Sequence, residues 1–171
     1  MKIKVKVLNK ICLPEIINKG EWIDLKASCT VHTRAPYANT LKRNTKGDYR
    51  TVEFEYHLIP LGVVIQVPKG FEAIIAPRSS TFKNWHIMQT NSIGVIDETY
   101  CGPNDEWKFP CIAFKDGIIL SGERICQFRI QPKQKATIWQ KLKWLFSNKI
   151  ELEYVDEIDA PNRGGIGSTG K

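Results

Sequence analysis

Long hydrophobic runs, paired cysteines and internal repeats are all missing from this chain. No stretch approaches the roughly 20 apolar residues of a membrane-spanning helix. The opening segment, MKIKVKVLNK, alternates charged and aliphatic side chains where a signal peptide would carry an apolar core. We therefore expect no signal peptide, no transmembrane helix and no membrane association. The expected location is the cytoplasm, or the host cytoplasm if the protein is viral.

The cysteines exclude two classes of small protein. All five are scattered along the chain, and none forms a C-x-x-C pair. This distribution argues against a disulfide scaffold and a zinc site, and it favours a reducing, cytosolic setting. With 171 residues the chain is long enough to form one domain that buries roughly two-thirds of the surface of its unfolded form.

Positive charge exceeds negative charge, but without a pattern typical of nucleic-acid binding. The chain has 25 Lys and Arg against 18 Asp and Glu, a net charge of +7. The basic residues are spread over the N-terminal segment, residues 34–50 and residues 133–149, and they form no known DNA- or RNA-binding motif. We expect no direct nucleic-acid binding, because a phosphate-rich small molecule and a solvated surface account for the charge.

Alternating apolar and polar residues predict an all-β fold. Residues 2–7 alternate lysine with Ile or Val, as in a half-buried strand whose exposed face carries lysines. Many short strands separated by Gly- and Pro-containing turns are typical of a sandwich or barrel. Further strands are predicted at 22–27, 51–58, 62–67, 71–76, 87–96, 108–114, 117–120, 124–130 and 150–155.

Two segments predict helices. Residues 79–84 follow a proline and begin with two hydroxyl residues, so Ser79 or Ser80 is a candidate N-cap of a short helix whose free N–H groups suit an anion. Residues 133–149 place apolar residues at helical spacing beside lysines, which predicts an extra helix near 135–147. We favour packing on its own domain or on a neighbouring subunit over a role at a membrane surface or with a protein partner.

A polar, basic segment at 34–50, RAPYANTLKRNTKGDYR, contains few large aliphatic residues. This composition predicts a mobile loop or a long hairpin. Segments of this composition are usually solvated surface. This segment is also, with residues 133–149, a place where a protein partner would bind.

The segment 91–103, NSIGVIDETYCGP, contains the first candidate for catalysis. Asp97 ends an apolar strand and precedes Tyr100. Burying a lone carboxylate is costly unless it has a partner or a task. A turn is the alternative explanation, because Asp is common where a strand reverses. The segment alone does not decide between the two.

Two other segments carry polar groups that suit phosphate. APRSS at 76–80 places Arg78 beside Ser79 and Ser80 at a predicted helix start, where guanidinium donors and helix N–H groups suit phosphate oxygens. An ordinary helix cap is the alternative. Gln127 lies on an otherwise apolar strand, where a hydrogen-bonded core amide is the usual explanation.

The glycine-rich tail, NRGGIGSTGK at 162–171, would ordinarily be a flexible tail. Its backbone N–H groups, Arg163, Ser168 and Thr169 are nevertheless suited to enclosing phosphates. The tail is not a P-loop, because it lacks the following Ser or Thr and the helix. Asp24, within a β-like run, either holds a metal through water or ends a strand.

Taken in order, five segments resemble the sequence boxes of the trimeric dUTP pyrophosphatases, the dUTPases. Any one box is moderately specific, whereas all five in sequence are very specific, and they span nearly the whole chain. They are WIDLKA at 22–27, APRSS at 76–80, NSIGVIDETYCGP at 91–103, GERICQ at 122–127 and GGIGSTG at 164–170.

This resemblance implies a jelly-roll β fold that assembles as a homotrimer, with three active sites at subunit interfaces. It also implies hydrolysis of dUTP to dUMP and pyrophosphate, which lowers dUTP and supplies dUMP for dTMP synthesis. Asp97 would be the general base for the water that attacks the α-phosphorus. Mg²⁺ would hold the triphosphate, and Asp24 would support the metal through its water shell.

The resemblance further implies the substrate contacts. Tyr100 would stack under the deoxyribose and leave no room for a 2′-hydroxyl. The uracil would be read by Asn91 and the backbone of Gly94, Val95 and Ile96. The phosphates would be bound by Arg78, Ser79, Ser80, Gln127, Ser168 and Thr169. Residues 1–160 would form one β domain, and residues 161–171 a flexible arm that closes over a site, usually of another subunit.

The fifth box departs from the family pattern at two places. Ile166, beside Gly167, stands where an aromatic is usual, so stacking on uracil is reduced to an aliphatic contact. The usual arginine of this box aligns with Pro161, two residues before Arg163. Assigning Arg163 to the γ-phosphate therefore depends on the reach of the arm.

Two alternatives remain at this point. dCTP deaminases resemble dUTPases in fold, but they need a glutamate on the strand after the third box and an arginine after the serine pair. Here that strand, KFPCIAF at 108–114, has no Glu, and Lys83 stands near the arginine position. The other alternative is a regulatory nucleotide-sensing trimer that binds a protein partner.

Overall fold

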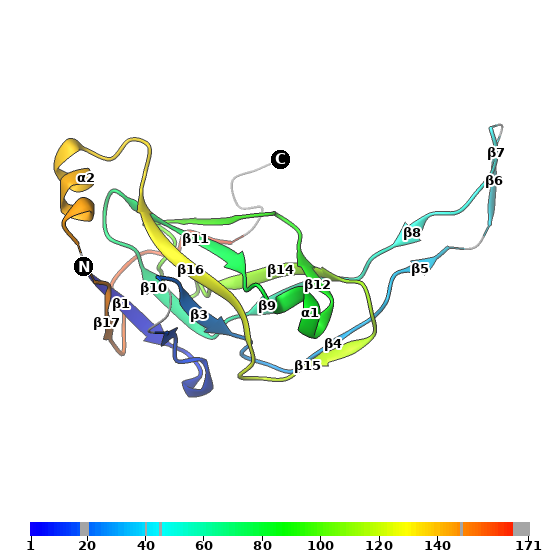
Figure 1. Cartoon of the computed structure of the whole chain (residues 1–171), viewed down its shortest axis with the longest axis horizontal. Helices are drawn as coiled ribbons and strands as arrows, with labels where there is room; N and C mark the ends of the chain where they lie inside the picture. Colours follow the sequence, from blue (N-terminus) through cyan, green and yellow to red (C-terminus); the bar gives the residue numbers. More distant parts are fainter. Residues whose placement is uncertain (18–20, 40, 45, 148, 166–171) are drawn as a thin grey trace.

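The computed structural model describes residues 1–17, 21–39, 41–44, 46–147 and 149–165, and its chain is mainly β-strand (Figure 1). The predicted all-β class is confirmed. The strands are β1 (Lys2–Val7), β2 (Glu15–Ile16), β3 (Ile23–Lys26), β4 (Val31–Thr33), β5 (Tyr37–Ala38), β6 (Lys42–Asn44), β7 (Gly47–Tyr49), β8 (Val52–Glu53), β9 (Tyr56–Pro60), β10 (Val63–Gln66), β11 (Phe71–Pro77), β12 (Ile87–Gln89), β13 (Gly94–Asp97), β14 (Lys108–Ala113), β15 (Gly117–Ile119), β16 (Arg124–Pro132) and β17 (Glu151–Tyr154). The helices are a 3-10 turn at Lys10–Cys12, α1 (Thr81–Trp85) and α2 (Ile138–Leu145).

Three sheets form the body of the molecule. A five-stranded sheet has the order β13-β11-β16-β3-β2, and two three-stranded sheets have the orders β10-β1-β17 and β12-β14-β9. Pairing is antiparallel within them except between β1 and β17, which run parallel. Strand β13 therefore lies at an edge of this sheet, where β11 is its neighbour among the described strands.

The core forms where the alternating apolar faces of these sheets meet. On β1, Ile3 and Val5 are buried while Lys2 and Lys4 are exposed, as the sequence pattern predicts. Trp107 is fully buried and meets Phe128 edge-on, with ring centroids 5.2 Å apart. Burial of such aromatic side chains supplies much of the hydrophobic stabilisation of a domain of this size.

The predicted strand at 87–96 is wrong as a single element. It forms two strands, β12 and β13, which belong to different sheets. The chain turns between them at Ser92, whose φ of 55° lies in the left-handed region that interrupts a strand. This turn frees the following residues to pair with β11 instead.

The described residues between 37 and 53 form a long hairpin, which is one of the two alternatives predicted for residues 34–50. β5 pairs with β8, and β6 pairs with β7, both antiparallel. Figure 1 shows this hairpin extending away from the body of the molecule along its longest axis.

Both predicted helices are present, with changed details. α1 begins at Thr81, and Ser80 at its N-cap makes no side-chain capping bond, so the expectation that Ser79 or Ser80 caps the helix is not confirmed. α2 begins with a capping box between Thr137 and Gln140. No residue of α2 is fully buried, but Gln140 donates to the Lys69 carbonyl at 3.1 Å, so the helix contacts its own domain over a small area; packing on a neighbouring subunit stays a prediction.

Candidate functional site

A pocket opens beside the edge strand β13. Its volume is about 400 Å³. Strand β13 supplies backbone groups on its outer side, where it has no strand partner in the described part of the chain. The pocket is lined by Leu58, Ile75, Gln89, Asn91, Gly94, Val95, Ile96, Tyr100, Lys108, Pro110, Arg163, Gly164 and Gly165. The predicted uracil-reading and sugar-stacking residues are therefore together with the start of the predicted arm.

Asp97, at the end of β13, is held by two neighbours. Its Oδ1 accepts hydrogen bonds from the Thr99 backbone N–H at 2.8 Å and from the Thr99 hydroxyl at 2.5 Å. Its Oδ2 lies 2.5 Å from Nη1 of Arg163. The sequence offered a turn residue and a candidate base as alternatives for Asp97. The structure makes them compatible, because Asp97 accepts the hydrogen bonds of a turn and lies beside the pocket.

These contacts keep Asp97 ionised. Partial burial acts to raise its pKa, but the two Thr99 hydrogen bonds and the charges of Arg163 and Lys133 outweigh it and hold the pKa below the ordinary value. A carboxyl group with a lowered pKa is unprotonated throughout the neutral pH range, which is the form that a general base requires. It is also one quarter exposed, at 25%, so a water molecule can reach it.

Two side chains of the pocket are positioned by hydrogen bonds. The Tyr100 hydroxyl donates to the Glu106 carbonyl at 3.0 Å, which fixes the ring against the pocket wall. Asn91 Oδ1 accepts from Gln89 Nε2 at 2.8 Å, and this orients the amide. Gln89 is therefore a supporting residue that the sequence did not single out.

The beginning of the C-terminal arm reaches this pocket in the same chain. The backbone N–H groups of Arg163 and Gly164 donate to the carboxylate of Asp105 at 2.9 and 3.2 Å. The Arg163 side chain forms an ion pair with Asp97. The predicted contacts of Ile166, Gly167, Ser168 and Thr169 lie outside the described residues.

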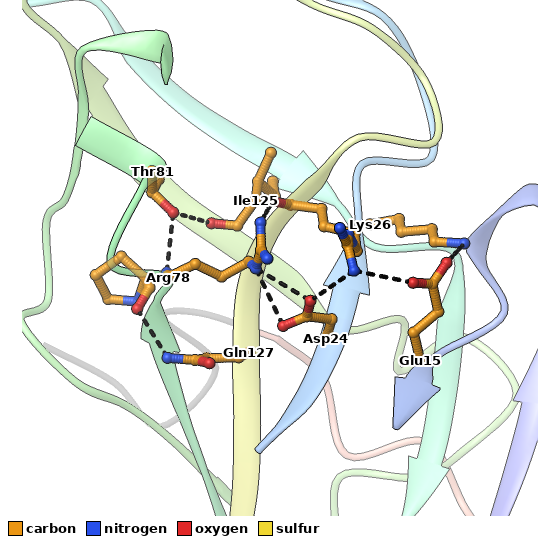
Figure 2. A network of polar contacts seen from close by, with 9 residues as sticks. Glu15, Asp24, Lys26, Arg78, Thr81, Ile125 and Gln127 are labelled. Carbon is orange, nitrogen blue, oxygen red and sulfur yellow. Dashed lines mark hydrogen bonds and ion pairs between the residues drawn. The ribbon is translucent and has the colours of Figure 1, made fainter. Parts of the chain in front are cut away.

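A second cluster of polar groups forms on β3, β16 and the end of β11 (Figure 2). Arg78 Nε lies 3.1 Å from both carboxylate oxygens of Asp24, and its Nη1 donates to the Arg124 carbonyl at 3.2 Å. Arg124 Nη1 lies 3.4 Å from Asp24 Oδ2. Gln127 donates to the Pro77 carbonyl at 3.3 Å, so it links β16 to β11 as the core-amide alternative predicted.

The charges of this cluster are largely neutralised within the protein. Burial raises the pKa of Asp24, and the nearby Arg78 and Arg124 offset that effect only in part. Glu15 extends the network, because it pairs with Arg124 at 3.1 Å and with Lys26 at 2.6 Å. The cluster thus fixes two guanidinium groups at the surface end of β11.

Hydrogen bonds of Thr81 explain how α1 begins without a serine cap. The Thr81 hydroxyl accepts from the Arg78 backbone N–H at 2.9 Å and donates to the Ile125 carbonyl at 2.7 Å. This bridge fastens the turn to β16. Ser79 is exposed and Ser80 is half-buried, at the same end of the molecule as Arg78.

Asp24 is the carboxylate of this cluster that the sequence predicts as a support for a metal ion. Among the residues that the structure describes, no three His, Cys, Asp or Glu side chains come together as a metal site. Asp24 Oδ2 is buried, and it is ion-paired with Arg78 at 3.1 Å and with Arg124 at 3.4 Å. Mg²⁺ commonly keeps several waters and takes its remaining ligands from carboxylates and substrate phosphates. The residues therefore fit a Mg²⁺ that is held mainly by phosphates.

The two clusters lie apart in a single chain. Asp97 pairs with Glu72 near one end of β11, whereas Arg78 follows the other end of the same strand. At a rise of 3.2–3.4 Å per residue, six residues of strand separate them by roughly 20 Å. One triphosphate does not span this distance and also bring its α-phosphorus to Asp97.

Some site residues were missed from the sequence. Thr99 had a local signal, because Asp commonly accepts a hydrogen bond from the backbone two residues later. Asp105 and Gln89 had none, since their contacts depend on which distant segments meet them. None of the helices in the described ranges is long and apolar enough to cross a membrane.

Comparisons with known proteins match this chain to dUTPases. A dUTPase family model matches residues 44–168. A prophage SPbeta-derived deoxyuridine 5'-triphosphate nucleotidohydrolase of Bacillus subtilis is 42% identical over 173 residues, covering 99% of each chain. The matched region ends within the fifth box, at residue 168.

Solved structures show the same fold. A dUTPase of Streptococcus mutans matches with a TM-score of 0.60 and 20% identity, over 75% of this chain and 94% of that chain. A mutant dUTPase of phage phi11 of S. aureus, whose structure reveals coordination of a structural Mg(II) ion, matches with a TM-score of 0.59 and 15% identity, over 80% of this chain and 94% of that chain. At 20% and 15% sequence identity, these two structures show that the fold is shared.

Proposed function

The chain belongs to the dUTPase family and is a dUTP nucleotidohydrolase, and from this premise we propose that Asp97 activates the water that cleaves dUTP. The observation that carries this assignment is the ionised Asp97 carboxylate at the pocket, held by Thr99 and Arg163. Neither a dCTP deaminase nor a purely regulatory trimer is favoured by the family match.

The reaction follows from this placement. Asp97 takes a proton from a water molecule as the water oxygen attacks the α-phosphorus of dUTP. The bond between the α-phosphorus and its bridging oxygen to the β-phosphate breaks, and pyrophosphate leaves with the bonding electrons. A positioned base of this kind contributes roughly 100- to 10,000-fold to such a step.

The pocket beside β13 binds the nucleoside. Backbone N–H and C=O groups of Gly94, Val95 and Ile96 are suited to the Watson–Crick edge of uracil, because β13 is an edge strand with one side unpaired in the described chain. Asn91 adds an oriented amide. The Tyr100 ring forms the wall on which the deoxyribose rests.

The second cluster binds phosphates, and it does so for a neighbouring subunit. Arg78 offers a guanidinium, with Ser79, Ser80 and Gln127 nearby as further polar groups. Since Asp97 and Arg78 of one chain lie roughly 20 Å apart along β11, a complete site takes them from different chains. A homotrimer with sites at its interfaces satisfies this requirement.

Mg²⁺ is the cation that we assign to the triphosphate, with Asp24 contacting its water shell. When bound, it neutralises negative charge on the phosphate oxygens. Arg78 and Arg124 add fixed positive charge on the protein side. The chain's own contribution is therefore to orient the triphosphate and to keep Asp97 aimed at the α-phosphorus.

Residues 1–160 are assigned to one β domain and residues 161–171 to an arm that completes the site. Arg163 supports this division, because the chain before it pairs with β1 and the chain from 163 on faces the pocket. Ile166 and Gly167 are assigned to the base and Ser168 and Thr169 to the phosphates.

Nucleotide hydrolysis tests the assignment directly. The purified protein with Mg²⁺ should release pyrophosphate from dUTP, with little from dCTP or dTTP and no ammonia from dCTP. Asp97→Asn should lower kcat about 1,000-fold, with Asp156→Asn, an exposed aspartate outside the pocket, as the matched control. An Asp97→Asn protein that turns over dUTP at the normal rate would refute the role of Asp97.

Two surfaces outside the site are assigned to a protein partner. Along α2, Ile138, Trp139 and Leu145 are 67%, 77% and 65% exposed beside lysines. The hairpin at 37–53 also projects from the body. Trp139→Ser should leave dUTP hydrolysis and folding intact, so loss of a bound protein from this variant would locate the contact on α2.

A further inference from the structure

Glu98 directly follows the candidate base Asp97 but lies just beyond the end of strand β13. Its Oε2 accepts a hydrogen bond from the Gly70 backbone N–H at 2.5 Å and lies 3.3 Å from Nζ of Lys133. Gly70 belongs to the turn before β11, and Lys133 is the residue that follows β16. One carboxylate next to the base is therefore tied to two segments that are distant in the sequence.

Glu98, Gly70 and Lys133 form a closed set of contacts at the end of the sheet. The Lys133 backbone N–H donates to the Gly70 carbonyl at 2.9 Å, which continues the pairing of β16 with β11 by one residue. On the other side of β11, the pairing with β13 ends at Asp97, and the Glu98 carboxylate supplies the acceptor for the Gly70 N–H. The chain just after Asp97 is thus fixed to β11 and, through it, to β16.

The ion pair between Glu98 and Lys133 is partly shielded from water. The two side chains are 24% and 26% exposed. Partly buried pairs are screened by salt much less than exposed pairs. A hydrogen bond from a backbone N–H to an ionised carboxylate is also stronger than one between neutral groups. The contacts of Glu98 are therefore suited to holding a segment of backbone in place.

Helix α2 contacts the same turn. Gln140 Nε2 donates to the Lys69 carbonyl at 3.1 Å. Gly70 has a φ of 86°, and a Cβ atom at this position would lie 2.2 Å from Gln140 Nε2. The turn therefore requires a glycine. The segment from Lys133 to α2 thus reaches, through this turn, the residue beside the candidate base.

We propose that Glu98 is a positioning residue for Asp97, and that its ion pair with Lys133 holds the end of β13 in place. A general base must lie within hydrogen-bonding reach of the water that it deprotonates. Thr99 orients the carboxylate of Asp97, whereas Glu98 fixes the backbone that carries this carboxylate. The inference rests on the proposed role of Asp97.

Glu98→Ala tests the positioning, because it removes both contacts of the carboxylate. We expect kcat for dUTP to fall about 10- to 100-fold, since misplacement of a site element by about 1 Å costs up to about 100-fold. KM should change little, because Tyr100 and the β13 backbone are retained. Glu157→Ala, an exposed glutamate outside the pocket, is the matched control and should change neither constant. A Glu98→Ala protein with wild-type kcat would overturn the proposal.

Glu98→Gln separates the hydrogen bond from the charge. Its amide oxygen still accepts from the Gly70 N–H, whereas the ion pair with Lys133 is lost. We expect a kcat between those of wild type and Glu98→Ala, which is a partial rescue by the conservative variant. Urea unfolding of both variants measures stability separately. A loss of stability with normal kcat in the folded protein would show a purely structural role and would contradict the positioning.

Lys133→Met tests the same pair from its other member and serves as a second variant if Glu98→Ala does not fold. We expect kcat to fall about as much as in Glu98→Gln. The double variant Glu98→Gln/Lys133→Met should be no slower than the slower single variant, because the two residues act through one contact. Lys135→Met, an exposed lysine two residues further on, is the matched control.

Two outcomes of this series would overturn the role of the pair. Losses that add fully in the double variant would show that Glu98 and Lys133 act independently. A raised KM with normal kcat in Lys133→Met would place Lys133 on the substrate instead. The assays are run at pH 7, well above the ordinary aspartate pKa of about 4, so that Asp97 is ionised in every variant.

Failure of this inference is distinguishable from failure of the proposed function. If Asp97→Asn remains fully active, the assigned base is wrong. If Asp97→Asn is inactive while Glu98→Ala and Lys133→Met turn over dUTP like wild type, the base stands and only the positioning by Glu98 is wrong.

Discussion

Asp97 is 25% exposed at the pocket, whereas Asp24 is 3% exposed within the Arg78 cluster. Both carboxylates face an arginine at hydrogen-bonding distance. Their pKa values nevertheless shift in opposite directions. For Asp97, hydrogen bonds from Thr99 and the charge of Arg163 outweigh burial, and the pKa is lowered. For Asp24, burial outweighs the charges of Arg78 and Arg124, and the pKa is raised.

The difference shows that an adjacent arginine does not by itself decide how an acid behaves. Asp97 remains in contact with water and keeps its charge, as a base for a water molecule requires. Asp24 is removed from water, and its charge mainly holds two guanidinium groups in place. In the proposed mechanism, the first region serves proton transfer and the second supplies fixed positive charge.

Removing Asp24 should have the largest effect on folding. Asp24→Leu leaves Arg78 beside a buried apolar group, and we expect the free energy of unfolding to fall by about 3 kcal/mol. Urea unfolding measures this change. The double variant Asp24→Leu/Arg78→Met should recover most of the loss, and a double variant as unstable as the single one would argue against an ion-pair origin.

Arg78→Met tests phosphate binding, and comparison with Asp24→Leu/Arg78→Met separates this effect from the stability that is lost when the buried Asp24 is left without Arg78. Loss of one charge-assisted contact should raise KM for dUTP roughly 10- to 100-fold, while kcat changes less because Asp97 is untouched. Steady-state kinetics measure the two constants separately. Lys83→Met, an exposed cation on α1, is the control. An equal rise in KM for both variants would place phosphate recognition in the general charge of this surface.

The pH profile tests the pocket. Asp97 has a lowered pKa, so the acid limb of kcat/KM should lie below about pH 4, the ordinary range of an aspartate. Thr99→Val removes a hydroxyl donor and should move that limb to higher pH, with a several-fold loss at acid pH. Thr99→Ser keeps the donor and should not move it. If Val and Ser give the same profile, the hydroxyl does not tune Asp97.

Acid should also affect the two aspartates oppositely in folding. Lowered pKa at Asp97 gives stability that is present above about pH 4 and lost as pH falls through the folded value. Raised pKa at Asp24 makes stability fall as pH rises from about 4 to its folded value. Asp24→Asn should therefore remove a negative slope of unfolding free energy against pH, measured by urea titration between pH 4 and 7. A slope that Asp24→Asn leaves unchanged would contradict the burial effect.

The smallest effect is expected at Ser80. Its side chain makes no capping bond to α1, so Ser80→Ala should change the free energy of unfolding by less than about 0.5 kcal/mol. KM for dUTP should rise a few-fold if the hydroxyl meets phosphate. Thr81→Ala, which removes the bridge to Ile125, is the contrasting variant and should destabilise the fold measurably.

Local chemistry made one part of this molecule predictable. The alternation of apolar and charged residues predicted strand β1. The APRSS segment predicted that Arg78 lies near the start of a helix. The position of Asp97 at the end of an apolar strand made it the candidate acid. The break at Ser92 was not predicted, because the apolar residues on both sides continue the strand pattern. The left-handed φ at Ser92 reflects the pairing of β13 with β11, which is a property of the folded sheet.

Contacts between distant segments made the other part unpredictable. Asp105 and the arm are brought together only when β17 pairs with β1 and the chain returns past the pocket. Arg163 was considered for a phosphate, whereas the structure places it on Asp97. For α2, the periodicity predicted the helix correctly but contained no information on whether the rest of the fold would cover it.

The hairpin at 37–53 has a hydrodynamic consequence. A compact chain of this length would have a radius of gyration of about 16 Å, and a protrusion along the longest axis adds frictional drag with little mass (Figure 1). The protein should therefore elute from a size-exclusion column ahead of globular standards of equal mass. Light scattering, which weighs particles independently of their shape, is the appropriate measure of its assembly, and shortening the hairpin should bring the two methods into agreement.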